Sequence, residues 1–422
     1  MNNGYLKRIS DEKLELLLQA KGAVLIEGPK WCGKTRTAEE IAKSILYMQD
    51  PDNSKANILT AKTKPSLLLD GETPRLLDEW QTAPELWNAV RFAVDKRRKN
   101  GQFILTGSVI PTRTDDMHTG TGRIARIKMR TMSLFESQDS TGEISLEALF
   151  NHEANMEGKS NLSIEQLAFV LNRGGWPAVA TEKNEKIALA VANDYLEAVV
   201  NEDISKADGI EKNPDRVKNL IRSLSRNISG EAKVSTVLND LKDNDEALSH
   251  VTIDQYITAL KKIFVIEDLP AWNVKLRSRT ALRTTSKRHF TDPSIAAASL
   301  RATPKRLLTD LNTFGFLFES LCIRDLRVYA DSIDGNVYHY RDKNNFEIDA
   351  IIQLADGRWG AVEVKMGAGE IENAAENLLK LKKIVDVQKM NEPSFLMVLT
   401  GTEYAFQMEN GVWVVPLGCL KN

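Results

Sequence analysis

A glycine-rich loop near the N-terminus constrains this chain more than any other segment. An apolar run of strand length, residues 23–27, leads into residues 28–35 with the pattern GxxxxGK[ST], and a helix-like stretch follows over 36–49. Strand, glycine loop and helix in this order are the context of a phosphate-binding loop. The backbone N–H groups can wrap a phosphate, Lys34 reaches the β- and γ-phosphates, and Thr35 ligates magnesium. The sequence therefore predicts that ATP and Mg²⁺ bind to Gly28, Pro29, Lys30, Trp31, Cys32, Gly33, Lys34 and Thr35.

Short apolar runs then alternate with helical patterns. The apolar runs cover 66–70, 76–78 and 103–106, and the helical patterns cover 10–20 and 83–98. This alternation predicts a parallel sheet with crossover helices, which is an α/β fold.

Acidic and hydroxyl side chains end two of these runs. Asp78 ends the run 76–78 and Glu79 comes directly after it; Asp78 can hold magnesium and Glu79 can polarise the attacking water. Asp70 competes with Asp78, but only Asp78 is followed by an acid that can serve as a base. An ordinary acid pair at a strand end is the alternative. Ser108 ends the run 103–106 and can sense the γ-phosphate, although a helix cap or a turn explains it too.

Two arginines in the segment 122–127 are candidates for transition-state stabilisation. Arg123 or Arg126 can reach across a subunit boundary and neutralise charge on the transferring phosphoryl group. The alternative is a structural arginine that pairs with an acid of its own chain.

Charge and cysteine content limit the classes of protein to which this chain can belong. With 56 Lys and Arg against 58 Asp and Glu, the net charge is −2, so any nucleic-acid surface must be local. One acid-free segment can follow a DNA backbone, although a charged edge strand explains it equally well. Its cations are Lys275, Arg277, Arg279, Arg283, Lys287 and Arg288. The 3 cysteines are far apart and no apolar run spans a bilayer, so we expect a cytoplasmic protein without a disulfide framework.

The C-terminal part of the chain again shows a pattern of alternating helices and strands. Helices are expected at 313–327 and 371–385, and strands at 337–341, 346–354, 360–365, 395–400 and 412–416. Asp356 and Gly357 form a turn signal between two of these strands, which predicts an antiparallel hairpin. A loop centred on Asp356 brings Asp349 opposite Glu363, and Lys365 shares their face.

Two carboxylates and a lysine on one sheet face form a candidate metal site. Hard oxygen ligands from Asp349 and Glu363 suit Mg²⁺ or Mn²⁺, and the ammonium of Lys365 can hold or deprotonate a water. A solvated strand face with cross-strand ion pairs is one alternative. A nuclease-like fold that kept its acids and lost productive substrate binding is the other.

Several of these segments together resemble one protein family. The chain is similar to prokaryotic AAA-type P-loop ATPases that carry a C-terminal domain of unknown function related to PD-(D/E)XK nucleases. The segments that carry the resemblance are 28–35, 74–81, 103–108, 122–126, 132–136, 174–177 and 290–293. The resemblance implies a P-loop ATPase core over 1–143, a helical lid or connector over 144–210, a winged-helix-like region over 211–290 and a nuclease-like domain over 291–422. It also implies that Glu319 is the helical acid beside Asp349, Glu363 and Lys365.

Two functional hypotheses follow from these features. The leading one is a homo-oligomeric ATPase that acts on DNA, with metal-dependent cleavage by the C-terminal domain left open. The alternative is a nucleotide-controlled regulatory switch whose nuclease-like domain is catalytically silent.

Overall fold

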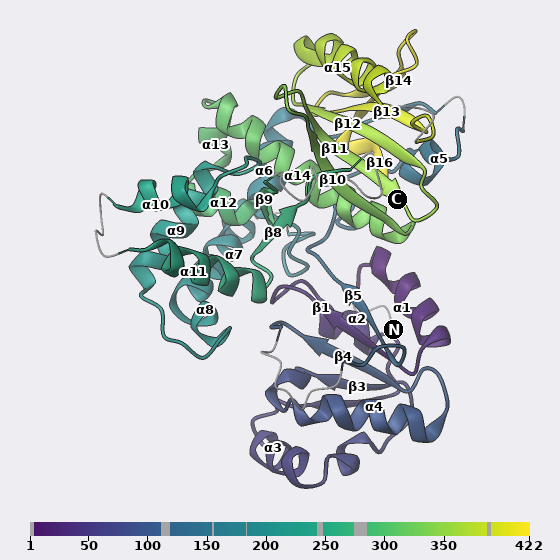
Figure 1. Ribbon diagram of the computed structural model, residues 1–422, viewed down its shortest axis with the longest axis vertical. Helices are drawn as coiled ribbons and strands as arrows, with labels where there is room; N and C mark the ends of the chain where they lie inside the picture. Colours follow the sequence, from purple (N-terminus) through teal and green to yellow (C-terminus); the bar gives the residue numbers. More distant parts are fainter. Residues whose placement is uncertain are drawn as a thin grey trace. The chain divides into compact units, whose positions relative to one another are not determined.

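The computed structural model describes residues 4–110, 119–153, 156–182, 184–242, 248–273, 285–385 and 390–422. The chain divides into two compact units. The N-terminal unit comprises Met1–Thr131, Glu202–Glu211 and Thr258–Val265, and the C-terminal unit comprises Met132–Asn201, Lys212–Ile257 and Ile266–Asn422. Figure 1 labels the elements of both units. Within the described ranges, no helix combines the length and the apolar character needed to cross a membrane.

The N-terminal unit is built on a five-stranded sheet with the order β2-β3-β4-β1-β5. Its strands are β1 (Ala23–Glu27), β2 (Ser44–Tyr47), β3 (Arg75–Asp78), β4 (Phe103–Gly107) and β5 (Ile124–Lys128). Every pairing between neighbouring strands is parallel. The predicted parallel sheet is therefore confirmed, and β4 separates β1 from β3.

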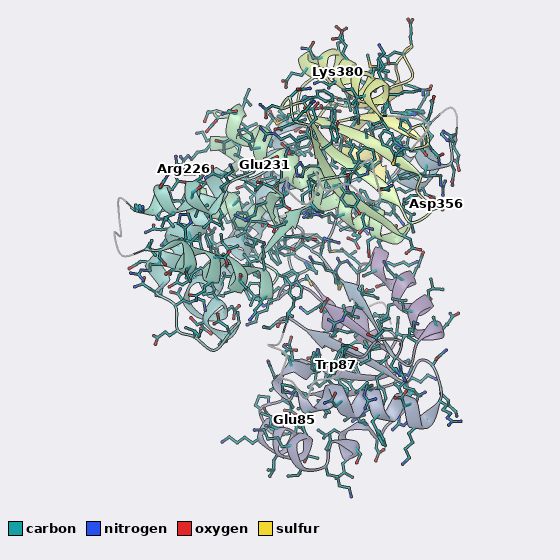
Figure 2. All side chains as sticks on the ribbon, viewed as in Figure 1. Glu85, Trp87, Arg226, Glu231, Asp356 and Lys380 are labelled. Carbon is teal, nitrogen blue, oxygen red and sulfur yellow. The ribbon has the colours of Figure 1, made fainter. Side chains whose placement is uncertain are left out.

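Alternating side chains of the central strands form two cores. Ala23 and Leu25 pack with Trp87 of α4 (Glu85–Arg97), the helix where Figure 2 labels this tryptophan. Val24 packs instead with Leu14 of α1 (Ile9–Ala20), in a cluster that also includes α2 (Lys34–Glu39). Because successive side chains of a strand point to opposite faces, the sheet is covered on both sides. Helix α3 (Ser54–Thr63) belongs to the layer of α4.

Two local predictions for this unit were wrong, and one strand was not predicted. The expected helix over 36–49 ends at Glu39, and β2 follows, since residues 44–47 pair with Arg75–Asp78 of β3. The run 66–70 is the 3₁₀ helix η1 (Pro65–Leu69), not a strand. Strand β5 went unrecognised because its charged residues obscure the apolar pattern. In each case a partner distant in sequence or a proline at the first turn decides the local structure.

The C-terminal unit contains a seven-stranded sheet with the order β10-β11-β12-β13-β15-β14-β7. The strands are β7 (Gly158–Lys159), β10 (Gly335–Arg341), β11 (Glu347–Leu354), β12 (Trp359–Lys365), β13 (Phe395–Thr400), β14 (Tyr404–Gln407) and β15 (Trp413–Pro416). The pairings β10–β11 and β11–β12 are antiparallel, whereas β12–β13 and β13–β15 are parallel. Helix α15 (Ile371–Ile384) covers one side of these strands and α14 (Leu311–Ser332) lies along the other (Figure 1).

The remaining elements are mostly helices. They are α5 (Leu146–Phe150), α6 (Ile164–Arg173), α7 (Glu185–Ala198), the π-helical turn η3 (Val199–Asp203), α8 (Ile204–Lys206), α9 (Pro214–Arg226), α10 (Val234–Lys242), α11 (His250–Lys262), α12 (Pro293–Leu300) and α13 (Pro304–Leu307). The short strands β6 (Ile144–Ser145) and β16 (Leu420–Lys421) pair in parallel. After α11, strand β8 (Ile266–Leu269) pairs antiparallel with β9 (Lys287–Phe290). Minor helical turns are η2 (Trp80–Thr82), η5 (Ala368–Glu370) and η6 (Leu417–Cys419).

A buried ionic network holds several loops of the C-terminal unit together. One carboxylate oxygen of Asp292 accepts hydrogen bonds from the backbone N–H of Gly175 at 2.9 Å and from the Arg324 guanidinium at 3.1 Å. Arg324 also pairs with Asp325, which accepts from the backbone N–H of Leu134 at 2.9 Å. The side chains of Arg324 and Asp292 are 1% and 0% exposed. Segments 174–177 and 290–293 are two of those that carry the family resemblance. They meet in this structural network.

Candidate functional site

The glycine loop lies at the carboxyl edge of the N-terminal sheet. It follows Glu27, the last residue of β1, which pairs with Gly107 at the end of β4. Ser108 comes next after Gly107, and Asp78 ends the neighbouring strand β3. Ligands of open α/β sheets bind outside the carboxyl ends of the strands. The parallel topology thus gathers the loop, the acid pair and Ser108 at one edge.

Backbone geometry explains both glycines of the loop. A Cβ atom on Gly28 would lie 2.1 Å from the carbonyl oxygen of Met129, so only glycine fits. Gly33 has a φ of 99°, in the left-handed region that glycine adopts without strain. The ammonium of Lys34 is buried and donates to the carbonyl oxygens of Gly28 at 3.0 Å and Pro29 at 2.7 Å. The loop therefore curls around its own lysine.

Asp78, not Asp70, meets the glycine loop. The Asp78 carboxylate accepts hydrogen bonds from the hydroxyls of Thr35 and Thr106, each at 2.7 Å. The Asp70 side chain is 77% exposed and pairs with Arg97 at 3.8 Å. A threonine hydroxyl and a carboxylate oxygen in contact are hard ligands that fit Mg²⁺. Thr35 and Asp78 are thus the residues that would hold the ion.

Glu79 is held in one orientation by its neighbours. Its backbone N–H donates to the hydroxyl of Thr106 at 3.2 Å, and its φ of 53° turns the chain sharply after β3. The carboxylate accepts from the Ser108 hydroxyl at 3.2 Å and from the Gln81 side-chain amide. The sequence analysis did not predict this contact of Gln81, although Gln81 lies two positions after Glu79.

The two candidate arginines pair with acids of their own unit. Ile124 pairs with Ala23, so Arg123 lies at the amino end of β1, the sheet edge opposite the glycine loop. Arg123 contacts Asp95 at 2.9 Å. The guanidinium of Arg126 contacts Glu27 at 3.0 Å and is 40% exposed. A role of either arginine in a neighbouring subunit stays a prediction.

Asp203 contacts the glycine loop, and the sequence analysis did not single it out. It ends the π-helical turn η3, and its carboxylate lies 2.5 Å from the ammonium of Lys30 in the glycine loop. The Asp203 side chain is 9% exposed, whereas that of Lys30 is 43% exposed. Irregular turns of this kind often occur at functional sites. No motif around Asp203 links it to the loop, because the contact joins segments that are distant in sequence.

In the C-terminal unit, the hairpin has the predicted register. Ala350 pairs with Val362, which brings Asp349 and Glu363 side by side one position further along. Asp349 accepts a hydrogen bond from the backbone N–H of Val364 at 2.8 Å, and the ammonium of Lys365 lies 3.2 Å from the Glu363 carboxylate. The turn between the two strands contains Asp356, labelled in Figure 2.

Lys287 corrects the predicted DNA surface. Instead of facing outward, its side chain is 6% exposed, and its ammonium lies 3.2 Å from Glu319 and 3.8 Å from Asp349. Arg288, on the opposite face of β9, pairs with Asp268 at 3.3 Å. The alternation of charged residues could not reveal that the Lys287 side chain is buried, because the sequence alone does not show which element covers β9. The other predicted DNA contacts, Lys275, Arg277, Arg279 and Arg283, lie outside the described residues.

Burial and mutual repulsion raise the pKa values of two acids in this cluster. Burial, followed by the charge of Asp349, raises the pKa of Glu363 to about 8, although Lys365 opposes the shift. The same two causes raise the pKa of Glu319 to about 7, against the effect of Lys287. Burial favours the neutral form of each carboxyl group because a charge loses its hydration there. Excess negative charge in the cluster is thus reduced by protons and by the two ammonium groups.

The donor set of this cluster does not fit a divalent metal as it is arranged. Among the residues that the structure describes, no group of three or more His, Cys, Asp and Glu side chains is positioned to hold a metal ion. The ammonium groups of Lys287 and Lys365 contact the carboxylates instead. Asp349, Glu363, Lys365 and Glu319 therefore come together as predicted, but as a charge-compensated cluster.

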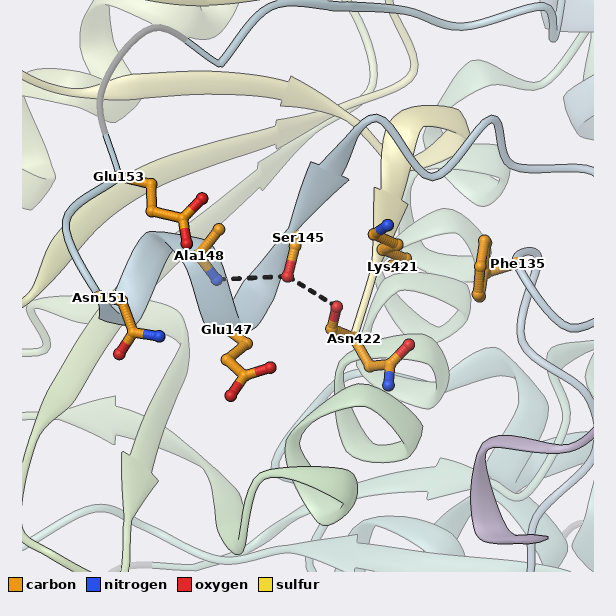
Figure 3. Close-up of a pocket in the computed structure, with 8 residues that line it drawn as sticks. All are labelled: Phe135, Ser145, Glu147, Ala148, Asn151, Glu153, Lys421 and Asn422. Carbon is orange, nitrogen blue, oxygen red and sulfur yellow. Dashed lines mark hydrogen bonds between the residues drawn. The ribbon is translucent and has the colours of Figure 1, made fainter. Parts of the chain in front are cut away.

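A pocket of about 570 Å³ opens elsewhere in the C-terminal unit (Figure 3). It is lined by Phe135, Ser145, Glu147, Ala148, Asn151, Glu153, Lys421 and Asn422. The Ser145 hydroxyl accepts from the backbone N–H of Ala148 at 3.2 Å and donates to the backbone oxygen of Asn422 at 2.8 Å. None of the predicted site residues lines this pocket.

Comparison with known families agrees with the geometry of the N-terminal unit. Residues 20–138 match the model of an AAA domain. Residues 164–306 and 314–420 match two domains of unknown function, DUF8612 and DUF4143. Uncharacterized proteins of Mycobacterium bovis and Mycobacterium tuberculosis are each 20% identical over 411 residues, covering 97% of this chain and 83% of theirs.

Three solved structures show a partial likeness to this chain. A Walker-type ATPase of Pyrococcus abyssi is 15% identical, covering 70% of this chain and 96% of its own, with a TM-score of 0.44. RuvB of Thermotoga maritima is 17% identical, covering 62% and 88%, with a TM-score of 0.28. A signal-transduction ATPase with numerous domains from Pyrococcus horikoshii is 15% identical, covering 78% and 50%, with a TM-score of 0.26. With the AAA-domain match and the glycine-loop geometry, the N-terminal part of the chain is a P-loop ATPase domain of the AAA type.

Proposed function

We propose that this protein is an ATP hydrolase that couples nucleotide turnover to action on DNA. The observation that carries the hydrolase part is the convergence of Lys34, Thr35, Asp78, Glu79 and Ser108 at one sheet edge. These residue types supply each component that phosphoryl transfer to water needs: a phosphate cradle, a cation for the phosphates, ligands for magnesium and a base.

Each residue has a distinct part in this hydrolysis. Lys34 exchanges its contacts with the loop carbonyls for the β- and γ-phosphates. Thr35 and Asp78 hold Mg²⁺, which neutralises phosphate charge when bound. Glu79 accepts the proton of the attacking water while the bond from the γ-phosphorus to the bridging oxygen breaks and ADP leaves. Ser108 keeps the Glu79 carboxylate directed toward that water.

In this proposal the enzyme is a homo-oligomer, and Arg126 of one subunit completes the site of the next. The exposed guanidinium must then leave Glu27 of its own chain. Subunits with Arg126→Ala and subunits with Glu79→Gln should each be inactive alone, and mixing them should restore part of the hydrolysis. If the mixture is as inactive as its components, Arg126 does not act across a subunit boundary.

The DNA part rests on the basic segment and its surroundings. Lys275, Arg277, Arg279 and Arg283 form a cluster of cations without an acid among them. The segment lies in sequence between β8 and β9, which follow the helices α9, α10 and α11. Helices followed by a two-stranded pair are compatible with the winged-helix-like region that the resemblance implies. Lysine and arginine in such a segment can neutralise consecutive phosphates.

The test measures ATP hydrolysis with and without double-stranded DNA at low and at physiological salt. DNA should bind, should change the hydrolysis rate, and should lose affinity steeply as salt rises. The triple variant Lys275→Ala, Arg277→Ala, Arg279→Ala should lose these effects and keep its basal hydrolysis. A control variant with Lys96→Ala, Arg97→Ala and Lys99→Ala, which removes three cations at and just after the C-terminal end of α4, should behave like the parent. If DNA neither binds nor changes the rate, the protein does not act on DNA.

A second candidate function is a nucleotide-controlled switch with a catalytically silent C-terminal domain. The contacts of Lys287 and Lys365 with the carboxylates favour it. Supercoiled and linear DNA incubated with protein and Mg²⁺ or Mn²⁺, with and without ATP, separates the candidates. Cleavage that disappears in Lys365→Ala indicates a metal-dependent nuclease. Binding without cleavage supports a catalytically silent C-terminal domain, and the effect of DNA on the hydrolysis rate then decides between the two candidates.

A further inference from the structure

The carboxylate cluster of the C-terminal unit contains a lysine that comes from outside the sheet. We propose that Lys287 is a built-in cation that occupies the metal position beside Asp349 and keeps the cluster closed to divalent metal ions. Two distances carry this proposal: the Lys287 ammonium lies 3.2 Å from Glu319 and 3.8 Å from Asp349. It therefore bridges an acid of α14 and an acid of β11, the position that a metal ion would take between them.

The backbone of β9 fixes Lys287 in this place. Lys287 pairs with Leu269 of β8, and side chains alternate along the strand. His289, on the same face as Lys287, is 1% exposed, and its ring lies 3.2 Å from the hydroxyl of Ser320, next to Glu319 in the sequence. Arg288 points to the other face and pairs with Asp268. The whole inward face of β9 is thus anchored against α14.

Charge balance explains why a metal ion is excluded while Lys287 stays. The cluster contains the acids Glu319, Asp349 and Glu363 and the cations Lys287 and Lys365. A divalent ion beside Asp349 would meet the buried ammonium at close range, where little water screens like charges. A lysine ammonium is a compact point charge, so it can take the place of a metal ion between two carboxylates. Metal binding at Asp349 and Glu363 therefore requires that Lys287 leave.

Mn²⁺ titration tests this proposal on the full chain without nucleotide. All variants carry Asp78→Asn, which removes metal binding by the ATPase site, and bound Mn²⁺ is measured from the loss of the free-ion electron paramagnetic resonance signal. The parent should bind no Mn²⁺ at the C-terminal cluster. Lys287→Met should bind one ion per chain, with a dissociation constant at least tenfold below the highest Mn²⁺ concentration at which the parent binds none, and adding Asp349→Asn should abolish this binding. Arg288→Met, the matched control on the other strand face, should behave like the parent.

The proposal fails if the parent itself binds an ion that Asp349→Asn removes. It fails equally if a folded Lys287→Met variant gains no Mn²⁺ binding. Because Lys287→Met leaves a buried carboxylate without its partner, the double variant Lys287→Met, Glu319→Gln provides a second test in which both members of the pair are neutral. Circular dichroism establishes folding in each case. The inference does not depend on ATP hydrolysis or on DNA binding, so its failure would leave the proposed function untouched.

Discussion

At the scale of single residues, side chains distant in sequence set the electrostatics of both sites. Asp203 brings a carboxylate to the glycine loop, and Lys287 brings an ammonium to the acids of the C-terminal sheet. Neither contact is visible in a motif, because local spacing carries no information about a partner more than a hundred residues away or about the element that buries it. Asp78 was predictable, since an acid pair at a strand end is a local signal.

Asp203 should weaken nucleotide binding in the resting protein. Its carboxylate pairs with the Lys30 ammonium at 2.5 Å. In the proposed function this contact competes with the phosphates for Lys30 and adds negative charge beside the glycine loop. We expect Asp203→Asn to bind ATP more tightly, by about two- to tenfold, which corresponds to roughly 0.4–1.4 kcal/mol. The fluorescence of Trp31, which is exposed in the loop, can report the titration. Glu202→Gln, a neighbouring acid that pairs with Lys206, is the control; unchanged or weaker affinity in Asp203→Asn would contradict the prediction.

His339 should make the C-terminal unit less stable in acid. Burial, followed by the charge of Lys287, lowers the pKa of His339 to about 4, whereas an unfolded histidine has a pKa near 6.5. The unfolded chain therefore binds the proton first. The contribution of neutral His339 to the unfolding free energy is complete above pH 6.5 and is lost as the pH falls toward 4.

The comparison uses His339→Phe, which cannot titrate. Between pH 7 and 4, the parent should lose about 2–3 kcal/mol more unfolding free energy than the variant, measured by urea denaturation. Titrating groups distant from His339 contribute equally to both proteins, so the difference reports His339 together with its coupling to Lys287 and His289. Parallel pH profiles would show that this histidine is not the cause.

At the scale of elements, the sequence predicted secondary structure best where a strand and its pairing partner are close together in the chain. The β11–β12 hairpin has the expected register because its turn and both strands are contiguous and one face is buried. Strands β2 and β5 were missed because each depends on a partner far away in the chain. Segments 174–177 and 290–293 were recognised only as a resemblance, and their physical role emerges from the Asp292–Arg324 contact.

Removing Arg324 should destabilise the C-terminal unit strongly. Arg324→Met leaves the buried carboxylates of Asp292 and Asp325 without their cation. Breaking one side of a buried ion pair costs about 3–5 kcal/mol. Urea unfolding of the parent and the variant measures this loss, with the exposed Arg306→Met as control. A loss below about 1 kcal/mol would mean that the network does not hold the loops together.

At the scale of the whole molecule, the N-terminal site and the C-terminal cluster differ in how much chemistry their arrangement supports. The parallel sheet gathers a phosphate loop, magnesium ligands and an oriented acid at one edge. The C-terminal cluster has its predicted acids and lysine, but a further lysine neutralises them. Sequence could predict the members of both sites and could not predict this second cation, because charge compensation depends on packing between elements.

The central claim is that the N-terminal site hydrolyses ATP with Glu79 as the base. Steady-state hydrolysis and ATP affinity should be measured for the parent, Lys34→Ala, Glu79→Gln and the control Asp70→Asn. Lys34→Ala should lose ATP binding, Glu79→Gln should bind ATP with a hydrolysis rate lowered by a factor of about 10² or more, and Asp70→Asn should match the parent. Hydrolysis by Glu79→Gln at the parental rate, or unchanged ATP affinity in Lys34→Ala, would contradict the account.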